Sequence, residues 1–493
     1  MATAPCAIPL VVGIACGPLE DAAAGAVGET FGSILRELQS AYPHTPLLLL
    51  SAEPAEARTA THEAARAQHV EVRQARSLAQ ISVVSDILVV ITDDSAATAK
   101  EVSAVVARRE VGHRTGGPGH LLDPLEVATT YEVVIGKGMS LDGPLPIKRI
   151  YPPRFNGDGS SEADFQSGLA RLDRFNEDIV SVAVPDHASL QSEKVFAAAD
   201  GAANILQRRF LFWQRVLYVF AFIAAGAQVM GGYPGGFGLV FASAKIAAVM
   251  GVVCAYIVVR RADYQNRYQD YRALSEGLRV ESAWTHGGVS DSVDNSYLRM
   301  QQTELKWIRS ALRTVSFLQA REVASGRNTA ALCDWVEGQR EYYLGASTLQ
   351  NARNLRFGRY IHVMEPVNVI AGVAFLIGLI GPKNWSIRMP MPFGRFGDLE
   401  YSLGVLAGIA ALTIALLISY VRARAFSEHA NRYQRMYLLF DQAYRLLQGP
   451  PELDEATERE VARQLGREAL AEHAEWLLTQ RERPISVVYT GAT

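Results

Sequence analysis

The sequence predicts an α/β domain at the N-terminus, followed by an all-α membrane region with four transmembrane helices and long cytosolic helices. Up to about residue 150, short apolar runs typical of buried strands alternate with helical patterns. Beyond residue 210, four apolar runs are long enough for helices that cross a bilayer. The mean hydropathy of the 493 residues is +0.05, and these four runs account for the positive value.

Composition excludes several classes of protein. With 48 Lys and Arg against 51 Asp and Glu, the formal net charge is −3, so the chain is not a globally basic nucleic-acid binder. The four cysteines are scattered and none stands in C-x-x-C spacing, which argues against a disulfide framework or a zinc site. The ten histidines form no H-E-x-x-H pattern, and no nucleophile-elbow motif occurs. We therefore expect no enzyme, no catalytic residue, no metal site and no nucleic-acid partner.

The N-terminal domain is expected to span residues 1–150. We expect its apolar beginning to be a strand rather than a secretory signal, because no Lys or Arg precedes Arg36. Continuous apolar strands separated by helices indicate a parallel sheet that is covered on both faces. The strands are predicted at 8–15, 46–50, 70–72, 87–91 and 132–135, and the strand at 132–135 is expected to be the last of the sheet. Helices are predicted at 26–40, 55–68 and 96–109.

The candidate ligand-binding residues are Gly17, Asp94, Thr98 and Glu101. Parallel sheets bind ligands outside the carboxyl ends of their strands, near helix N-termini, which selects the turn at Gly17 and the segment 92–101. The Thr98 hydroxyl and the backbone N–H groups at the start of a helix are suited to hold a phosphate or a ribose. Glu101 lies one turn later, where it caps that helix or accepts from a hydroxyl. The alternative is that Thr98 and Glu101 form an ordinary helix cap.

These segments resemble the SLOG superfamily. The resemblance rests on strand one with its Gly turn, on Thr45-Pro46-Leu47-Leu48-Leu49-Leu50-Ser51, on Ser85-Asp86-Ile87-Leu88-Val89-Val90 and on Thr98-Ala99-Lys100-Glu101. It implies a Rossmann-like fold that senses or processes a nucleotide-derived ligand; no other cofactor is expected. Ala96 and Ala97 stand where the family carries glycines, which favours a scaffold that has lost its ligand as the alternative.

The second half of the chain is predicted to cross the membrane four times. The segment 151–194 reads as a linker with a helix near 162–180. Transmembrane helices are expected at about 210–230, 237–259, 361–381 and 402–421, because about 20 residues cross ~30 Å of hydrocarbon. A buried soluble bundle is the alternative.

Flanking charge predicts the orientation of these helices. Three basic residues, Lys383, Arg388 and Arg395, lie in the two hairpin loops. The positive-inside rule therefore predicts a multi-pass protein of the bacterial inner (cytoplasmic) membrane with both termini in the cytoplasm. Twelve arginines flank the other ends of the helices: Arg208, Arg209, Arg215, Arg260, Arg261, Arg267, Arg353, Arg356, Arg359, Arg422, Arg424 and Arg432.

An internal repeat divides the membrane region into domains 195–330 and 331–450, followed by a C-terminal cytosolic helix and tail at 451–493. The sequence Asn-Arg-Tyr-Gln at 266–269 recurs at 431–434, and both copies enter and leave the membrane in the same order. An aromatic stripe on each exit helix predicts packing between helices.

The repeats resemble SLATT-type proteins, which pair two transmembrane helices with cytosolic helices. The resemblance rests on the segments 270–280, 297–299, 304–309, 335–343 and 468–476. It implies a tandem pore-forming effector of a prokaryotic defence system.

Three intramembrane polar residues are candidates for a pore or an assembly contact: Lys245, Glu365 and Asn368. A lysine near the bilayer centre costs about 2.5–3.5 kcal/mol on insertion scales, so Lys245 should face protein or water. Three roles are open to Lys245: it lines a pore, its side chain extends to the membrane interface, or it pairs with Glu365. The Glu365-Pro366 step either kinks its helix or marks the membrane boundary, and Asn368 is suited to an interhelical hydrogen bond.

Taken together, the sequence predicts a membrane effector in which a nucleotide-sensing domain controls a pore-forming helical module. Its expected partners are the lipid bilayer, further copies of the chain as a homo-oligomer, and a nucleotide second messenger. The alternative is a membrane-anchored scaffold or regulator with a ligand-free domain and no pore.

Overall fold

The computed structural model divides the chain into two compact units. The first contains residues 1–204, 269–332 and 454–479, and the second contains 205–268, 333–453 and 480–493. The two-repeat division expected from sequence therefore differs from this one, because each repeat contributes to both units. The structure describes residues 6–16, 21–52, 57–93, 109, 128–135, 141, 143–151, 161–185, 188–231, 238–298, 305–320, 327–380, 388–390, 396–449 and 453–481.

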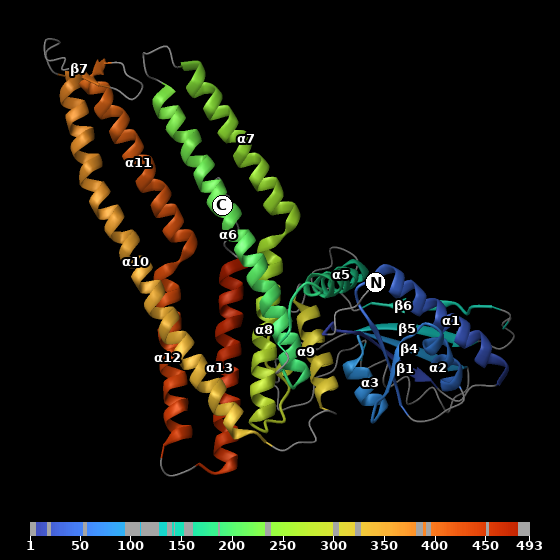
Figure 1. The fold of residues 1–493 in the computed structure, drawn as a ribbon. Coiled ribbons are helices and arrows are strands. Elements are labelled where there is room, and N and C mark those ends of the chain that lie inside the picture. Colours follow the sequence, from blue (N-terminus) through green and yellow to red (C-terminus); the bar gives the residue numbers. More distant parts are fainter. Residues whose placement is uncertain are drawn as a thin grey trace. The chain divides into compact units, whose positions relative to one another are not determined.

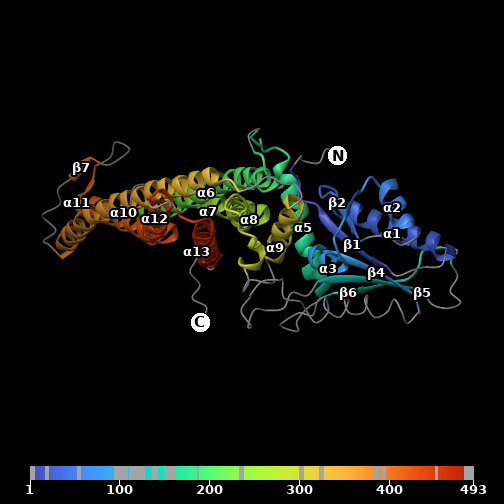
Figure 2. The same ribbon diagram turned by 90° about the horizontal axis from the view of Figure 1, so that it is seen from below.

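A six-stranded sheet forms the centre of the first unit (Figures 1 and 2). Its strand order is β3-β2-β1-β4-β5-β6, and all neighbours are parallel except β5 and β6. The predicted parallel α/β arrangement is thus confirmed for five strands. The elements are β1 (Leu10–Cys16), α1 (Asp21–Ala41), β2 (Leu47–Ser51), α2 (Ala57–Ala67), β3 (Glu71–Gln74), α3 (Leu78–Val84), β4 (Ile87–Asp93), β5 (Thr129–Ile135) and β6 (Ile147–Ile150).

The prediction that residues 132–135 form the last strand is wrong, because β6 follows β5 and pairs with it antiparallel. This strand lies at the edge of the sheet and carries Lys148 and Arg149 at its centre. Charged residues are common on edge strands, where they discourage pairing with other chains, but they remove the apolar signal that identifies a strand in sequence.

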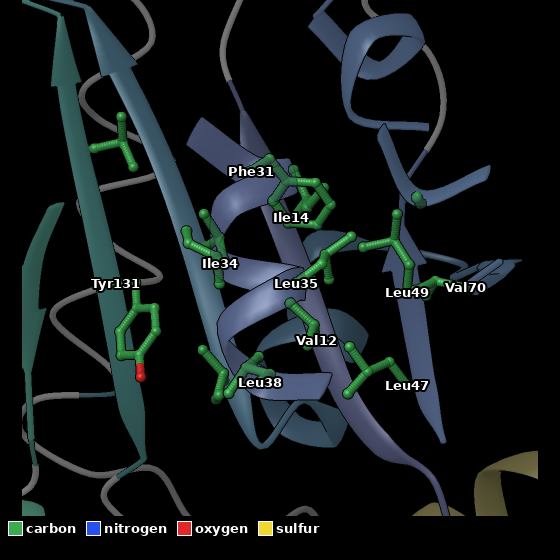
Figure 3. Packing of buried hydrophobic residues seen from close by; sticks show 14 of the residues in the cluster. Val12, Ile14, Phe31, Ile34, Leu35, Leu38, Leu47, Leu49, Val70 and Tyr131 are labelled. Carbon is green, nitrogen blue, oxygen red and sulfur yellow. The ribbon is translucent and has the colours of Figure 1, made fainter. Parts of the chain in front are cut away.

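One face of the sheet is covered by α1, whose apolar residues recur at helical spacing. Phe31, Ile34 and Leu35 are almost completely buried and pack against residues of β1 and β2 (Figure 3). Strands covered on both faces read as continuous apolar runs, and this explains the fully buried Leu47–Ser51.

Helix α5 (Ser161–Ile179) also packs on this core, so the segment expected to be a linker contains a buried element. Leu169 belongs to the same apolar cluster as α1. The Asn176 side chain accepts from the N–H of Ile8 and donates to its carbonyl, both at 2.9 Å. The Gly, Pro and Ser content that suggested a linker lies in the flanks of this helix.

The opposite face of the sheet is covered by α3 and by α9 (Lys306–Gln319), which comes from much later in the chain. Phe317 and Leu318 of α9 join a cluster with Val11, Leu48 and Ile81. Ser310 of α9 donates a short hydrogen bond to Asp86, which lies immediately before β4.

The first unit also contains helices from later in the chain. It includes most of α8 (Tyr264–His286), the 3₁₀ turn η1 (Val293–Asn295) and most of α13 (Glu455–Arg481). Gly466 of α13 lies against Trp284 of α8, where an added Cβ would be 2.2 Å from the indole Nε1. The same nitrogen donates to the carbonyl of Ala462 at 3.0 Å.

We expect Gly466→Ala to lower the stability of the first unit by about 1–2 kcal/mol, because overpacking the Trp284 contact outweighs the gain in helix propensity. The measurement is the apparent unfolding midpoint of the full chain in detergent. Gly25→Ala in α1 is the matched control, since nothing lies within 4 Å of its added Cβ, and it should raise the midpoint. Equal effects of the two substitutions would contradict this packing.

Among its described residues, the second unit contains four helices long and apolar enough to span a membrane, as predicted (Figure 1). They are part of α6 (Gln191–Gly231), α7 (Gly238–Ala262), part of α10 (Thr329–Ile380), and α11 (Leu399–Arg424). The short strands β7 (Arg388–Pro390) and β8 (Phe396–Asp398) pair between α10 and α11. Large apolar side chains on these helices face outward, with Leu239 87% and Ile370 69% exposed. Such surfaces require lipid or further protein to cover them.

The four helices pack as antiparallel neighbours. Gly251 of α7 faces the ring of Phe220 of α6, and Gly404 of α11 faces the ring of Phe375 of α10. The two hairpins meet through α6 and α11, where Gly408 lies against Val229. These glycines allow close helix approach, as is typical of helix packing in membranes.

The exit helices of the two predicted repeats begin in the same way. Helix α8 follows α7 after Asp263, and α12 (Phe426–Gln448) follows α11 after Ala425. Both linking residues have positive φ, at 50° and 46°, so each copy bends through a left-handed residue. The aromatic stripe packs between helices as predicted: Phe440 of α12 contacts Trp335 and Tyr343 of α10.

Candidate functional sites

The carboxyl edge of the sheet is the first candidate site. Strand β1 pairs with β2 on one side and β4 on the other, so the strand order reverses at β1. Cys16, at the end of β1, pairs in register with Ile91, and β4 ends two residues later at Asp93. Open parallel sheets bind ligands at such a switch point.

The predicted ligand residues Gly17, Asp94, Thr98 and Glu101 lie outside the described residues. Their positions in sequence remain informative, since Gly17 directly follows β1 and Asp94 directly follows β4. The prediction that these residues bind a ligand therefore stays a prediction.

A serine–histidine pair at this edge was missed by the sequence analysis. Ser51 is the last residue of β2 and is 3% exposed, and its Oγ lies 2.9 Å from Nε2 of His62 on α2. Ser51 pairs in register with Ile14 of β1 on one side and with Gln74 of β3 on the other. A strand that ends in Ser, followed by a helix with a half-buried His, is too common a pattern to have identified the pair.

Arg109 lies at the opposite end of the strands, where it links elements near the amino ends of β4 and β5. Its side chain is fully buried and donates to the carbonyls of Ser82, Ser85 and Thr129. Burial lowers the pKa of Arg109 to about 9, while the nearby charge of Asp86 opposes this shift. The residue ties α3, the start of β4 and the start of β5 to one another, which is a structural role.

Asp86 links the sheet to α9. It accepts from the N–H of Val11 at 2.8 Å and from the hydroxyl of Ser310. Burial raises its pKa, although these hydrogen bonds and the charges of Arg313 and Arg109 act in the other direction. Arg313 also donates to the carbonyl of Val83 at 3.2 Å.

A second polar cluster lies between α8, η1 and α9. Glu281 of α8 is buried and accepts from the N–H of Val293 at 3.1 Å and from the hydroxyl of Ser316 at 2.6 Å. Its neighbour Asp294 forms an ion pair with Arg313 at 2.8 Å. Burial raises the pKa of Glu281 to about 7, with the charge of Asp294 adding to the effect. A carboxyl group that titrates near neutrality is thus built into the contact between these helices.

In the second unit, Lys245 of α7 donates to the side-chain oxygen of Gln228 of α6 at 2.8 Å. The pairing with Glu365 considered from sequence is not the one observed. Glu365 lies 3.6 Å from Nδ1 of His362 on its own helix and is 53% exposed. Helix α10 continues through Pro366, and Asn368 is half-buried on the same helix. The three predicted polar residues therefore do not gather in one site.

Within the described ranges, no group of three or more His, Cys, Asp or Glu side chains is placed to hold a metal ion. Comparisons with protein-family models, with curated proteins and with solved structures gave no match.

Proposed function

We propose that this chain is a membrane effector in which a SLOG-like domain binds a nucleotide-derived signal and controls a SLATT-like helical module that permeabilises the membrane. The observation that carries this proposal is the union, in one chain, of a parallel sheet with a strand-order reversal and four helices long and apolar enough to cross a bilayer. A sheet edge of this type is a common ligand site, and the helices supply the means to act on a membrane.

The proposed ligand binding is supported by polar groups near the switch point. The Ser51–His62 pair lies one strand away from the β1–β4 reversal. The imidazole of His62, which is half-buried and held by the buried Ser51 hydroxyl, is suited to hydrogen-bond a ribose or a phosphate. Thr98 and Glu101 follow β4 in the sequence.

The proposed permeabilisation of the membrane is supported by the contact between Lys245 and Gln228. A lysine inside an apolar helix is costly, and a glutamine on the neighbouring helix lowers that cost without neutralising the charge. In an assembly of several copies, such a cation would face a water-filled path. We infer an orientation with both termini in the cytoplasm of a bacterium, because the arginines cluster at one end of the helices.

Control by the ligand requires two states of the helices with different affinities for it. Helices α6, α8, α10 and α13 each contain residues of both compact units. A ligand-induced change in the first unit would thus reach the second unit through continuous helices.

The proposed ligand binding can be tested with the variant Thr98→Ala/Glu101→Ala in the full chain reconstituted in nanodiscs. Binding of linear and cyclic nucleotides is measured by calorimetry. We expect at least one nucleotide to bind the natural protein and its affinity to fall about tenfold or more in the variant, since hydrogen bonds to a charged group contribute about 1.5–3 kcal/mol each.

The matched control is Thr59→Ala/Glu63→Ala, at two exposed positions of α2. It should bind as the natural protein does. Binding that is unchanged in the Thr98/Glu101 variant, or no binding by the natural protein to any nucleotide of the panel, would contradict the sensing role.

A further inference from the structure

Six of the exposed arginines at one end of the four apolar helices of the second unit are considered together. They are referred to below as the arginine belt. Among the described residues, none of them forms an ion pair with a carboxylate, and the guanidinium groups are therefore available to an outside partner. The belt consists of Arg209 and Arg215 on α6, Arg260 on α7, Arg356 and Arg359 on α10, and Arg422 on α11.

Helix packing brings the belt to one level. The rings of Tyr218 and Tyr420 are 5.7 Å apart, and because α6 and α11 are antiparallel, Arg215 and Arg422 lie on the same side of this contact. The ring of Phe357 lies 5.4 Å from that of Tyr420, which puts the adjacent Arg356 at this height on α10.

The α6–α7 hairpin places Arg260 about one helical turn from this level. Gly251 of α7 faces Phe220 of α6, and the helices run antiparallel. Moving nine residues along each helix from this contact leads to Arg260 on α7 and to a position between Arg209 and Arg215 on α6. Four helices thus contribute positive charge to the same end of the bundle.

The sequence around the belt contains very few acidic residues that could balance this charge. No Asp or Glu occurs between Asp200 and Asp263. The same is true between Glu341 and Glu365, and between Glu400 and Glu428. Like charges held at one level repel one another, so the arrangement favours a bound anion.

We infer that the arginine belt binds the phosphate groups of anionic phospholipids in the adjoining leaflet. All six residues are arginine, and the guanidinium group matches a phosphate through two parallel hydrogen bonds, whereas lysine offers only a point charge. Ring contacts place Tyr218, Tyr420 and, through Phe357, Tyr360 near the same height, as aromatic residues are at a membrane interface. The inference rests on the membrane placement of the proposed function, but neither on its pore nor on its ligand.

Trp213 provides a local probe, because it lies on α6 between Arg209 and Arg215. The full chain is placed in nanodiscs of phosphatidylcholine that contain an increasing fraction of brominated phosphatidylglycerol or brominated phosphatidylcholine. Quenching of Trp213 is taken as the difference between the natural protein and Trp213→Phe, which removes the contribution of the other tryptophans. We expect brominated phosphatidylglycerol to quench Trp213 at a concentration about tenfold lower than brominated phosphatidylcholine.

Three variants identify the groups responsible. Arg215→Gln/Arg356→Gln/Arg422→Gln should lose this preference, and the corresponding triple lysine variant, which keeps the charge needed for insertion, should retain only part of it. The control Arg36→Gln/Arg66→Gln/Arg174→Gln removes three exposed arginines from α1, α2 and α5, and should keep the full preference.

Several results would overturn the inference. Equal quenching of Trp213 by the two brominated lipids would remove the anionic-lipid site but leave the membrane placement intact. No quenching by either lipid would overturn both. An undiminished preference in the triple glutamine variant would show that the belt is not the site. Loss of the preference in 10 mM inorganic phosphate at constant ionic strength would assign the site to a soluble anion instead.

Discussion

Replacing Arg109 with methionine is expected to destabilise the first unit by about 3–5 kcal/mol, because the substitution removes a buried charge on which several groups depend. Three buried carbonyls lose their donor, and Asp86 loses a neighbouring positive charge. For a unit of this size, the loss corresponds to a fall of roughly 10 °C in the apparent melting temperature. The measurement is thermal unfolding of the full chain in detergent, followed by pulse proteolysis.

Two further variants make this test specific. Arg109→Lys keeps the charge but supplies fewer donors, and should fall between the natural protein and the methionine variant. Arg66→Met replaces an exposed arginine of α2 and should change the stability by less than about 0.5 kcal/mol. A loss of 1 kcal/mol shifts the midpoint by about 2–4 °C, so a methionine variant that melts within about 2 °C of the natural protein would disprove the role assigned to Arg109.

The second large effect is a pH dependence caused by Glu281. Its pKa in the folded protein is raised to about 7 by burial, so the protonated form stabilises the fold. This contribution is complete below the ordinary pKa of glutamate, and it is lost as the pH rises through 7. The size of the loss is about 3 kcal/mol, from the difference of the two pKa values.

Glu281→Gln mimics the protonated form and should remove this dependence. The difference in unfolding midpoint between the variant and the natural protein is measured from pH 5 to pH 8.5. We expect it to increase in favour of the variant by several degrees between pH 5 and pH 7, and to level off above pH 7. Glu468→Gln, at an exposed position of α13, controls for the loss of one negative charge. A difference that stays constant over this range would rule out titration of Glu281.

The sequence predicted the elements that have a strong periodic signal. The apolar strands and the four long helices were located to within a few residues, because burial on both faces and the width of a bilayer leave continuous apolar runs. Strand β6 was missed, since two charged residues occupy its centre. Helix α9 could not be assigned to the sheet, because its contact with β1 and β2 joins residues more than 250 positions apart.

The candidate sites show the same difference between local and long-range information. The segments that follow β1 and β4 in the sequence are indicated by the order of the strands, so sequence alone selected them. The partners of individual polar residues depend on packing between helices. Gln228 rather than Glu365 lies beside Lys245. Ser51 at the end of β2 contacts His62 on α2.

The central claim is that a nucleotide-type signal opens a path through the membrane. The most direct test is release of a trapped dye and of ions from liposomes that contain the purified full chain, measured with and without each nucleotide of the panel. We predict release that depends on one nucleotide and that decreases when Lys245 is replaced by methionine. Absence of release with every nucleotide, from protein shown to be inserted and oligomeric, would contradict the pore and favour a membrane-anchored scaffold.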